Sequence, residues 1–180
     1  MCYIKVSTFY KEFVSYNSNL VLSNNYLGSD VMEYEKEWVK YIDQIKIIRE
    51  RRNKNIEKKV PSEHSINILK KWVSENIAEN LWLEDYEKFL MIQNGFEFNG
   101  LIFYGTEDYK NNLISENEAW DWNGESFEHE YLFLGDADIS WYVFDIKDNS
   151  FAELDKPSGD LIQKFSDFDS MLTYALQNVL

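Results

Sequence analysis

The stretch from Tyr86 to Gly105 constrains the fold most, because its apolar residues change from a helical to a strand period within it. Tyr86, Phe89 and Leu90 fall on one helical face, since residues three and four positions apart share a face. Asn94-Gly95 then ends the helix, because glycine readily adopts the left-handed conformation that often follows a last helical turn. The sequence therefore predicts a helix that leads directly into a strand.

The second half of this stretch predicts one apolar strand over residues 96–104. Phe96 and Phe98 are separated by a polar residue, as expected on a strand with one buried face. Gly100 interrupts the run, and we expect a β-bulge there because bulges often contain glycine. No nucleophile or cluster of metal ligands lies in this stretch, so we interpret it as structural.

A long amphipathic helix is predicted over residues 30–59, with Asp30 as its N-cap and Glu33 reaching back to it. Its apolar residues repeat at spacings of three and four: Val31, Tyr34, Trp38, Tyr41, Ile45 and Ile48. We expect residues 1–60 to form an N-terminal helical extension packed on a main domain of residues 61–180. The apolar stripe is too short for a coiled coil, which favours a monomer.

The end of this helix is basic, with seven Lys or Arg residues between positions 46 and 59. A basic arm can bind nucleic acid, but Glu50 and Glu57 interrupt the positive charge and no aromatic residue lies among the basic ones. We therefore interpret this segment as a solvated helix end.

A helix is also predicted after Pro61, with Ser62 as its N-cap. Its buried face would consist of Ile66, Leu69, Val73 and Ile77, with Trp72 beside them in the core.

The rest of the chain predicts short strands and two short helices. The strands are residues 131–134, 141–144 and 151–154, with a turn at 147–150 and a brief edge at 161–162. Ser115 with Glu118 resembles a capping box for a helix that ends near Trp120, and Ser166 with Asp169 begins the last helix. The expected inner face of that last helix is Phe168, Leu172, Ala175 and Leu176. Helices, then an antiparallel meander, then a closing helix indicate an α+β fold.

Charge is distributed unevenly along the chain. Residues 1–60 carry a net charge of +3, whereas residues 61–180 carry −17, which gives −14 for the whole chain. A surface of that sign repels phosphate backbones, so we expect no nucleic-acid partner. Such a surface attracts a basic protein. The alternative interpretation, which explains the composition equally well, is that the acidic residues only keep the protein soluble.

The N-terminus lacks the pattern of a secretory signal, and no apolar run is long enough to span a membrane. Cys2 is the only cysteine, which fits a reducing compartment. We therefore expect a cytoplasmic protein without a membrane partner.

Few residues are suited to catalysis or to a cofactor. The two histidines, His64 and His129, are isolated, and Cys2 lies at the terminus. Asp136 and Asp138 form the best candidate for a cation site, together with Asp145 or Asp148. That arrangement lacks the glycine and bidentate glutamate of a complete calcium loop, so a solvated turn is the preferred interpretation. We predict no enzymatic activity, no cofactor and no metal.

The best candidate for a partner-binding site is the acidic segment after the short helix. It combines a tryptophan with carboxylates, the composition expected where a protein grips a basic partner. The predicted partner-binding residues are Asp121, Trp122, Glu125, Glu128, Glu130, Asp136 and Asp138. An ordinary acidic loop is the competing interpretation, and Trp120 is expected in the core.

Several of these features, taken in order, resemble the SUKH superfamily, in particular its YrhA-like bacterial members. The resemblance starts at Asp85-Tyr86 and Phe89-Leu90 and continues through Asn94-Gly95 to Gly105. It continues with the helix at Trp120, Tyr131–Gly135, Trp141–Asp145 and the closing Phe165–Phe168 segment, over about residues 62–180. Trp82-Leu83 stands where the family has Leu-Pro before the acidic residues, so this helix start lacks its proline.

The resemblance implies an α+β fold with a mixed, mostly antiparallel sheet flanked by helices. It also implies an intracellular immunity protein that binds and neutralises a polymorphic toxin, often a basic nuclease. Other members of the superfamily are regulatory scaffolds, including a fungal cell-wall synthesis regulator. A regulatory scaffold is therefore the alternative expectation, and a small-ligand or metal-binding protein is a third.

Overall fold

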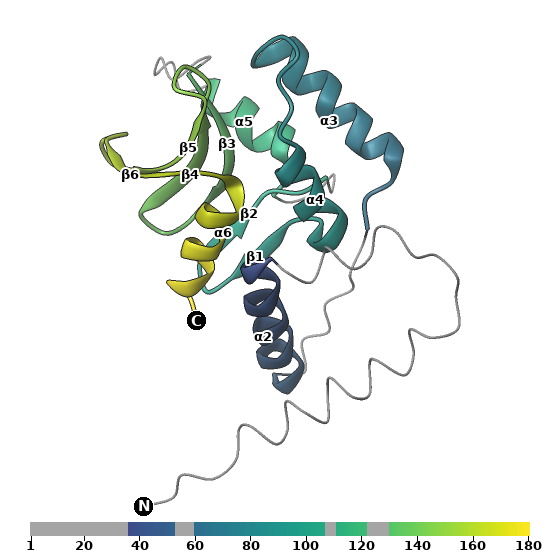
Figure 1. Cartoon of the computed structure of the whole chain (residues 1–180), viewed down its shortest axis with the longest axis vertical. Helices are drawn as coiled ribbons and strands as arrows, with labels where there is room; N and C mark the ends of the chain where they lie inside the picture. The colour runs from purple at the N-terminus through teal and green to yellow at the C-terminus, as the bar shows by residue number, and fades with distance from the viewer. Residues whose placement is uncertain (1–35, 53–59, 107–110, 122–129) are drawn as a thin grey trace, which may run out of the picture. The chain divides into compact units, whose positions relative to one another are not determined.

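An antiparallel sheet of six strands forms the centre of the fold, and each strand pairs with the next one along the chain (Figure 1). The computed structural model describes residues 36–52, 60–106, 111–121 and 130–180, all within one unit that spans Lys36–Leu180. The strands are β1 (Phe96–Phe98), β2 (Leu101–Phe103), β3 (Tyr131–Asp136), β4 (Ser140–Asp145), β5 (Ser150–Asp155) and β6 (Leu161–Phe165). The described helices are α2 (Glu37–Arg51), α3 (Glu63–Asn76), α4 (Glu84–Gln93), α5 (Leu113–Asp121) and α6 (Phe168–Gln177). The predicted α+β class is confirmed.

Aromatic side chains join α4 and α6 to one face of the sheet. The ring of Phe103 on β2 lies 6.0 Å from that of Phe89 on α4 and 6.1 Å from that of Phe168 on α6. Trp38 of α2 makes an edge contact with Phe89, at 5.9 Å between ring centroids. All four residues are fully buried, so the sheet, α4, α6 and α2 share one core, to which α3 and α5 also contribute.

The joint between α4 and the sheet follows the prediction at its helical end and differs from it in the strand. Gly95 has a φ of 78° and ends the helix as expected. The predicted single strand with a bulge at Gly100 is wrong, because Asn99 and Gly100 have φ values of 48° and 84° and form a tight turn. Two successive left-handed residues fit the type I′ turn that favours Asn-Gly, and β1 and β2 are the two arms of a hairpin.

A β-bulge does occur, but in β3. The pairing of β3 with β4 shifts between Phe133 and Gly135. A Cβ atom at Gly135 would lie 2.4 Å from the carbonyl oxygen of Ile102 on β2. Glycine is therefore required where β2 approaches the bulged strand.

The helix predicted over residues 30–59 is shorter at its N-terminal end. Lys36 has an extended backbone and α2 begins at Glu37, so the predicted start at Asp30 is wrong. The Lys36 ammonium lies 3.3 Å from Asp85 and 2.9 Å from Asp169, which anchors this residue to α4 and α6. Residues 1–35 and 53–59 lie outside the described part of the chain, and nothing in the structure tests the predicted extension over residues 1–60.

The buried face of α2 is rotated relative to the prediction. It consists of Trp38, Ile42 and Ile45, whereas Tyr41 and Ile48 are only partly buried at its margin. The α6 face likewise includes Met171 besides the predicted residues.

The helix cap was predicted correctly at α3, whereas at α5 and α6 it was predicted three residues and one residue out of place. Ser62 caps α3 by accepting a bond from the Ser65 N–H. At α5 the side chain of Asn112 accepts from the N–H groups of Ile114 and Ser115, so the predicted box beginning at Ser115 is wrong.

The last cap and one tryptophan also differ from the prediction. The capping box of α6 joins Asp167 and Ser170 rather than Ser166 and Asp169. Trp72, expected in the core, is only partly buried, and its indole donates to Glu118 at 3.2 Å.

Two hairpin features complete the sheet. β4 and β5 pair along their whole length around the predicted turn, which confirms that hairpin. β6 is five residues long, where only a brief edge at 161–162 was predicted.

Within the described ranges, no helix has the length and apolar character needed to cross a bilayer.

Candidate protein-binding surface

A buried asparagine fixes α5 against the sheet. The Asn117 side chain donates to the carbonyl oxygen of Phe133 on β3 at 2.8 Å and accepts from its N–H at 2.9 Å. It also donates to the carbonyl oxygen of Leu113, one turn back in α5. The amide therefore takes the place of a neighbouring strand beside β3, and it sets the position of the adjacent Glu116.

Glu116 and Asp136 bring two carboxylates near each other at the junction of α5 and β3. Burial, with the nearby charge of Asp136 as a second cause, raises the pKa of the Glu116 carboxyl above its ordinary value. Burial also raises the pKa of Tyr104, and both carboxylates contribute to that shift. Asp136 is partly neutralised, because Lys156 approaches it to 2.7 Å. Negative charge is thus concentrated here beyond what the lysine balances.

The turn from β3 to β4 presents an apolar residue beside these carboxylates. Ile139 is 68% exposed, and its carbonyl oxygen accepts a bond of 2.9 Å from the Lys156 N–H. Asp138 precedes it and lies over the β1–β2 turn, since a Cβ at Gly100 would meet its Oδ1 at 2.7 Å. We call Glu116, Asp136, Asp138 and Ile139 the β3–β4 end of the molecule.

The structure separates the predicted partner-binding residues that it describes. Asp136 and Asp138 belong to the β3–β4 end, whereas Glu130 precedes β3 at its other end, where its carbonyl accepts from the Ile146 N–H. Asp136 lies six positions after Glu130 along an extended chain, which places them about 20 Å apart. Trp122, Glu125 and Glu128, and the side chains of Asp121 and Trp120, lie outside what the structure describes.

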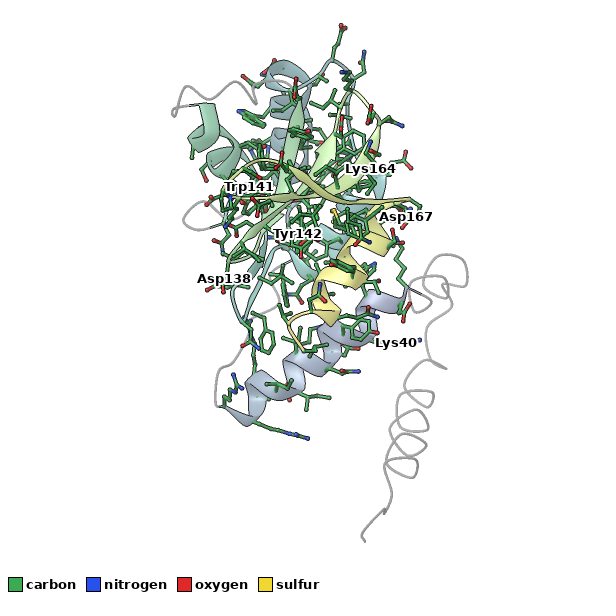
Figure 2. All side chains as sticks on the ribbon, turned by 90° about the vertical axis from the view of Figure 1, so that its left-hand side faces the viewer. Lys40, Asp138, Trp141, Tyr142, Lys164 and Asp167 are labelled. Carbon is green, nitrogen blue, oxygen red and sulfur yellow. The ribbon has the colours of Figure 1, made fainter. Side chains whose placement is uncertain are left out.

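The same separation disfavours the candidate cation site. Asp145 and Asp148 lie at the β4–β5 turn, where the Asp145 carboxylate accepts from the Asp148 N–H at 2.9 Å. Asp148 pairs there with Lys164, and Figure 2 shows Lys164 and Asp138 at separate places on the molecule. These aspartates cannot share one ion with Asp136 and Asp138. In the part of the chain that the structure describes, no group of three or more acidic, histidine or cysteine side chains is arranged to hold a metal.

The isolated residues considered for catalysis remain isolated where they are described. His64 is exposed in the first turn of α3, and His129 and Cys2 lie outside the described residues.

Sequence reasoning missed Glu116 and Ile139. Glu116 lies 20 positions before Asp136, and no local pattern brings them together. Ile139 carried a signal, since a large apolar residue between Asp138 and Ser140 in a turn is rarely buried.

Neither a comparison with protein-family models nor a search of curated proteins finds a match to this chain.

Proposed function

We propose that this chain is a protein-binding module without catalytic activity, an immunity protein that binds and neutralises a basic toxin in the cytoplasm. The observation that carries the proposal is the exposure of Ile139 among the carboxylates of the β3–β4 end. The resemblance to the SUKH superfamily in the sequence supports the same function. We propose no nucleic-acid or membrane partner and favour a monomer.

Physical chemistry explains how such a surface would bind. Carboxylates on the rim of an interface accelerate the encounter with a basic partner, and a desolvated apolar residue at its centre supplies much of the affinity. Within the described residues Asp138 forms no ion pair, so its charge remains available to a partner. The predicted residues Trp122, Glu125 and Glu128 and the side chain of Asp121 lie outside what the structure describes and stay predictions, and Glu130 lies at the far end of β3.

The direct test is co-expression with the toxin gene expected beside this one, with bacterial growth as the measurement. We expect the wild-type chain to restore growth and Ile139→Lys with Asp138→Lys to fail. The matched control is Ile47→Lys, because Ile47 is also exposed, at 48%, and belongs to a different element, α2. Full rescue by the double variant would contradict the assignment of this surface.

Association kinetics test the predicted segment separately. Asp121→Lys with Glu125→Lys and Glu128→Lys should slow association with the toxin at low salt and leave the melting temperature unchanged. Unchanged kinetics would remove these residues from the interface.

A regulatory scaffold is the second candidate, and the separation of Glu130 from Asp136 favours it. Two acidic places about 20 Å apart along a strand leave room for two separate partners. A scaffold would bind several basic proteins weakly, whereas an immunity protein would bind one toxin tightly. Titration calorimetry with purified candidates distinguishes these outcomes.

A further inference from the structure

The two outer strands of the sheet are protected to different degrees. On β1 the guanidinium of Arg49 from α2 lies 6.0 Å from the ring of Phe96 and 5.9 Å from that of Phe98, so a side chain of α2 lies against this strand. β6 is the other outer strand, and within the described ranges it pairs only with β5 (Figure 1). An outer strand with free backbone groups can accept a further strand.

β6 exposes apolar side chains where such edges are usually blunted. Leu161 is 51% exposed and Ile162 is 49% exposed. Lysine commonly guards a free edge, but here the Lys164 ammonium is bound by the Asp148 carboxylate. The pairing with β5 shifts at Ile162, which has no paired residue on β5, while Gln163 to Phe165 pair regularly.

A buried carboxylate lies one strand inside this edge. Glu153 on β5 is only 6% exposed and pairs with Gln163 on β6. Its Oε1 lies 3.4 Å from the Tyr142 hydroxyl, and its Oε2 has no hydrogen-bond partner. A buried carboxylate oxygen without a partner is costly to the folded protein, so it attracts a cation that reaches it.

The geometry of a sheet indicates where that cation would come from. Neighbouring strands lie about 4.8 Å apart, so a residue paired with Gln163 from outside would lie about 10 Å from Glu153 on the same face. The long side chain of Lys or Arg can lie along Gln163 and bring its charge toward Oε2.

Charge around the edge favours the same kind of partner. Residues 145–169 carry seven Asp or Glu against three Lys. Two of those lysines, Lys156 and Lys164, are already held in ion pairs. A second copy of this acidic chain is therefore a poorer occupant of the edge than a basic segment.

We propose that β6 docks an extended basic segment of a partner protein as a seventh strand, with a Lys or Arg opposite Gln163 directed toward Glu153. This docking proposal rests on the proposed function only in taking the partner to be basic. Beyond that function, it names the binding surface and the mode of binding.

The test uses the full chain and three blocked synthetic peptides. The first alternates Lys and Val over seven residues, the second replaces each Lys by Thr, and the third is the first with alternate backbone nitrogens methylated. Fluorescence anisotropy of labelled peptides measures binding. We expect the Lys peptide to bind at least tenfold more tightly than either of the others, because it alone has both charge and free backbone donors.

Two variants locate the binding. Ile162→Lys should weaken binding of the Lys peptide at least tenfold. The matched control is Ile68→Lys, because Ile68 has a similar exposure, 47%, but lies on α3. This control should change the affinity less than twofold. Glu153→Gln should remove most of the difference in affinity between the Lys peptide and the Thr peptide. Circular dichroism checks that each variant is folded.

Three results would overturn the proposal. They are equal binding of the methylated peptide, equal weakening by both Ile→Lys variants, and a dimer of the free chain that Ile162→Lys dissociates. The last would mean that a second copy occupies the edge. Because the peptides replace the toxin, failure here leaves the growth-rescue test of the proposed function unaffected, and failure of rescue leaves this binding measurement valid.

Discussion

The indole nitrogen of Trp38 donates a hydrogen bond of 2.8 Å to Oδ1 of Asp169 and so joins residues that are 131 positions apart in the chain. The ammonium of Lys36 approaches the same carboxylate to 2.9 Å. One side chain at the start of α6 therefore anchors the N-terminal end of α2. Figure 1 shows these two helices in the described unit.

We expect Asp169→Ala to lower the free energy of unfolding by about 1–3 kcal/mol, because a buried indole N–H and a largely buried ammonium lose a charged acceptor. Urea denaturation measures the loss. The control is Lys88→Ala, which breaks an exposed pair with Asp85 and should cost less than about 0.5 kcal/mol. Equal effects of the two changes would show that the Asp169 contacts contribute little.

We expect Gly135→Ala to destabilise the protein by about 2–3 kcal/mol, since the added methyl group would meet the backbone of β2 at 2.4 Å. Gly100→Ala provides the comparison, because there the added atom meets the movable side chain of Asp138. Adding Asp138→Ala should restore part of the stability that Gly100→Ala removes. It should restore none of the stability that Gly135→Ala removes. Recovery at both positions would contradict a backbone clash at the bulge. Thermal unfolding of the four variants makes the measurement.

We expect Asn117→Leu to cost about 3 kcal/mol, because it removes the two buried hydrogen bonds that Asn117 makes with the backbone of Phe133. The same substitution at exposed Asn67 on α3 should change stability by less than about 0.5 kcal/mol. Hydrogen exchange at the Phe133 amide should accelerate only in the Asn117 variant. Unchanged protection of that amide would mean that Asn117 does not replace a strand.

Glu116 gives the protein a defined pH dependence. Its pKa is raised in the folded state, so the unfolded chain loses this proton first as the pH rises from about 4. At a pH above its pKa in the folded state, this carboxyl therefore lowers the free energy of unfolding. At a pH below its pKa in the unfolded state, it has no such effect. Glu116→Gln should be more stable than the wild type near pH 7, and the difference should shrink toward about pH 4. A difference that is the same at both pH values would contradict the raised pKa.

Local signals predicted the parts of the fold that depend on neighbouring residues. Gly95 and Ser62 marked helix ends correctly, because the left-handed turn and the side-chain cap involve only adjacent backbone. Asn99-Gly100 was also a local signal for a hairpin, but β1 and β2 have three residues each and their apolar side chains run together as one apparent strand.

The rest depended on tertiary contacts that no local pattern contains. Tyr41 and Ile42 both continue the apolar stripe of α2, and only packing against the core selects Ile42 as the buried residue. The distance between Glu130 and Asp136 depends on β3, which begins directly after Glu130 and ends at Asp136. The approach of Glu116 to Asp136 needs Asn117 to fix α5 beside β3.

The consecutive order of the strands has a consequence for how the chain folds. Hairpins between neighbouring strands close short loops, so most of the sheet can assemble quickly from local encounters. The contact of α2 with α6 instead closes a loop of more than 130 residues and carries a larger entropic cost. The transition state should therefore contain the β3–β4–β5 meander while α2 is still undocked. Changes at Trp38 or Asp169 should then accelerate unfolding and leave the refolding rate nearly unaltered.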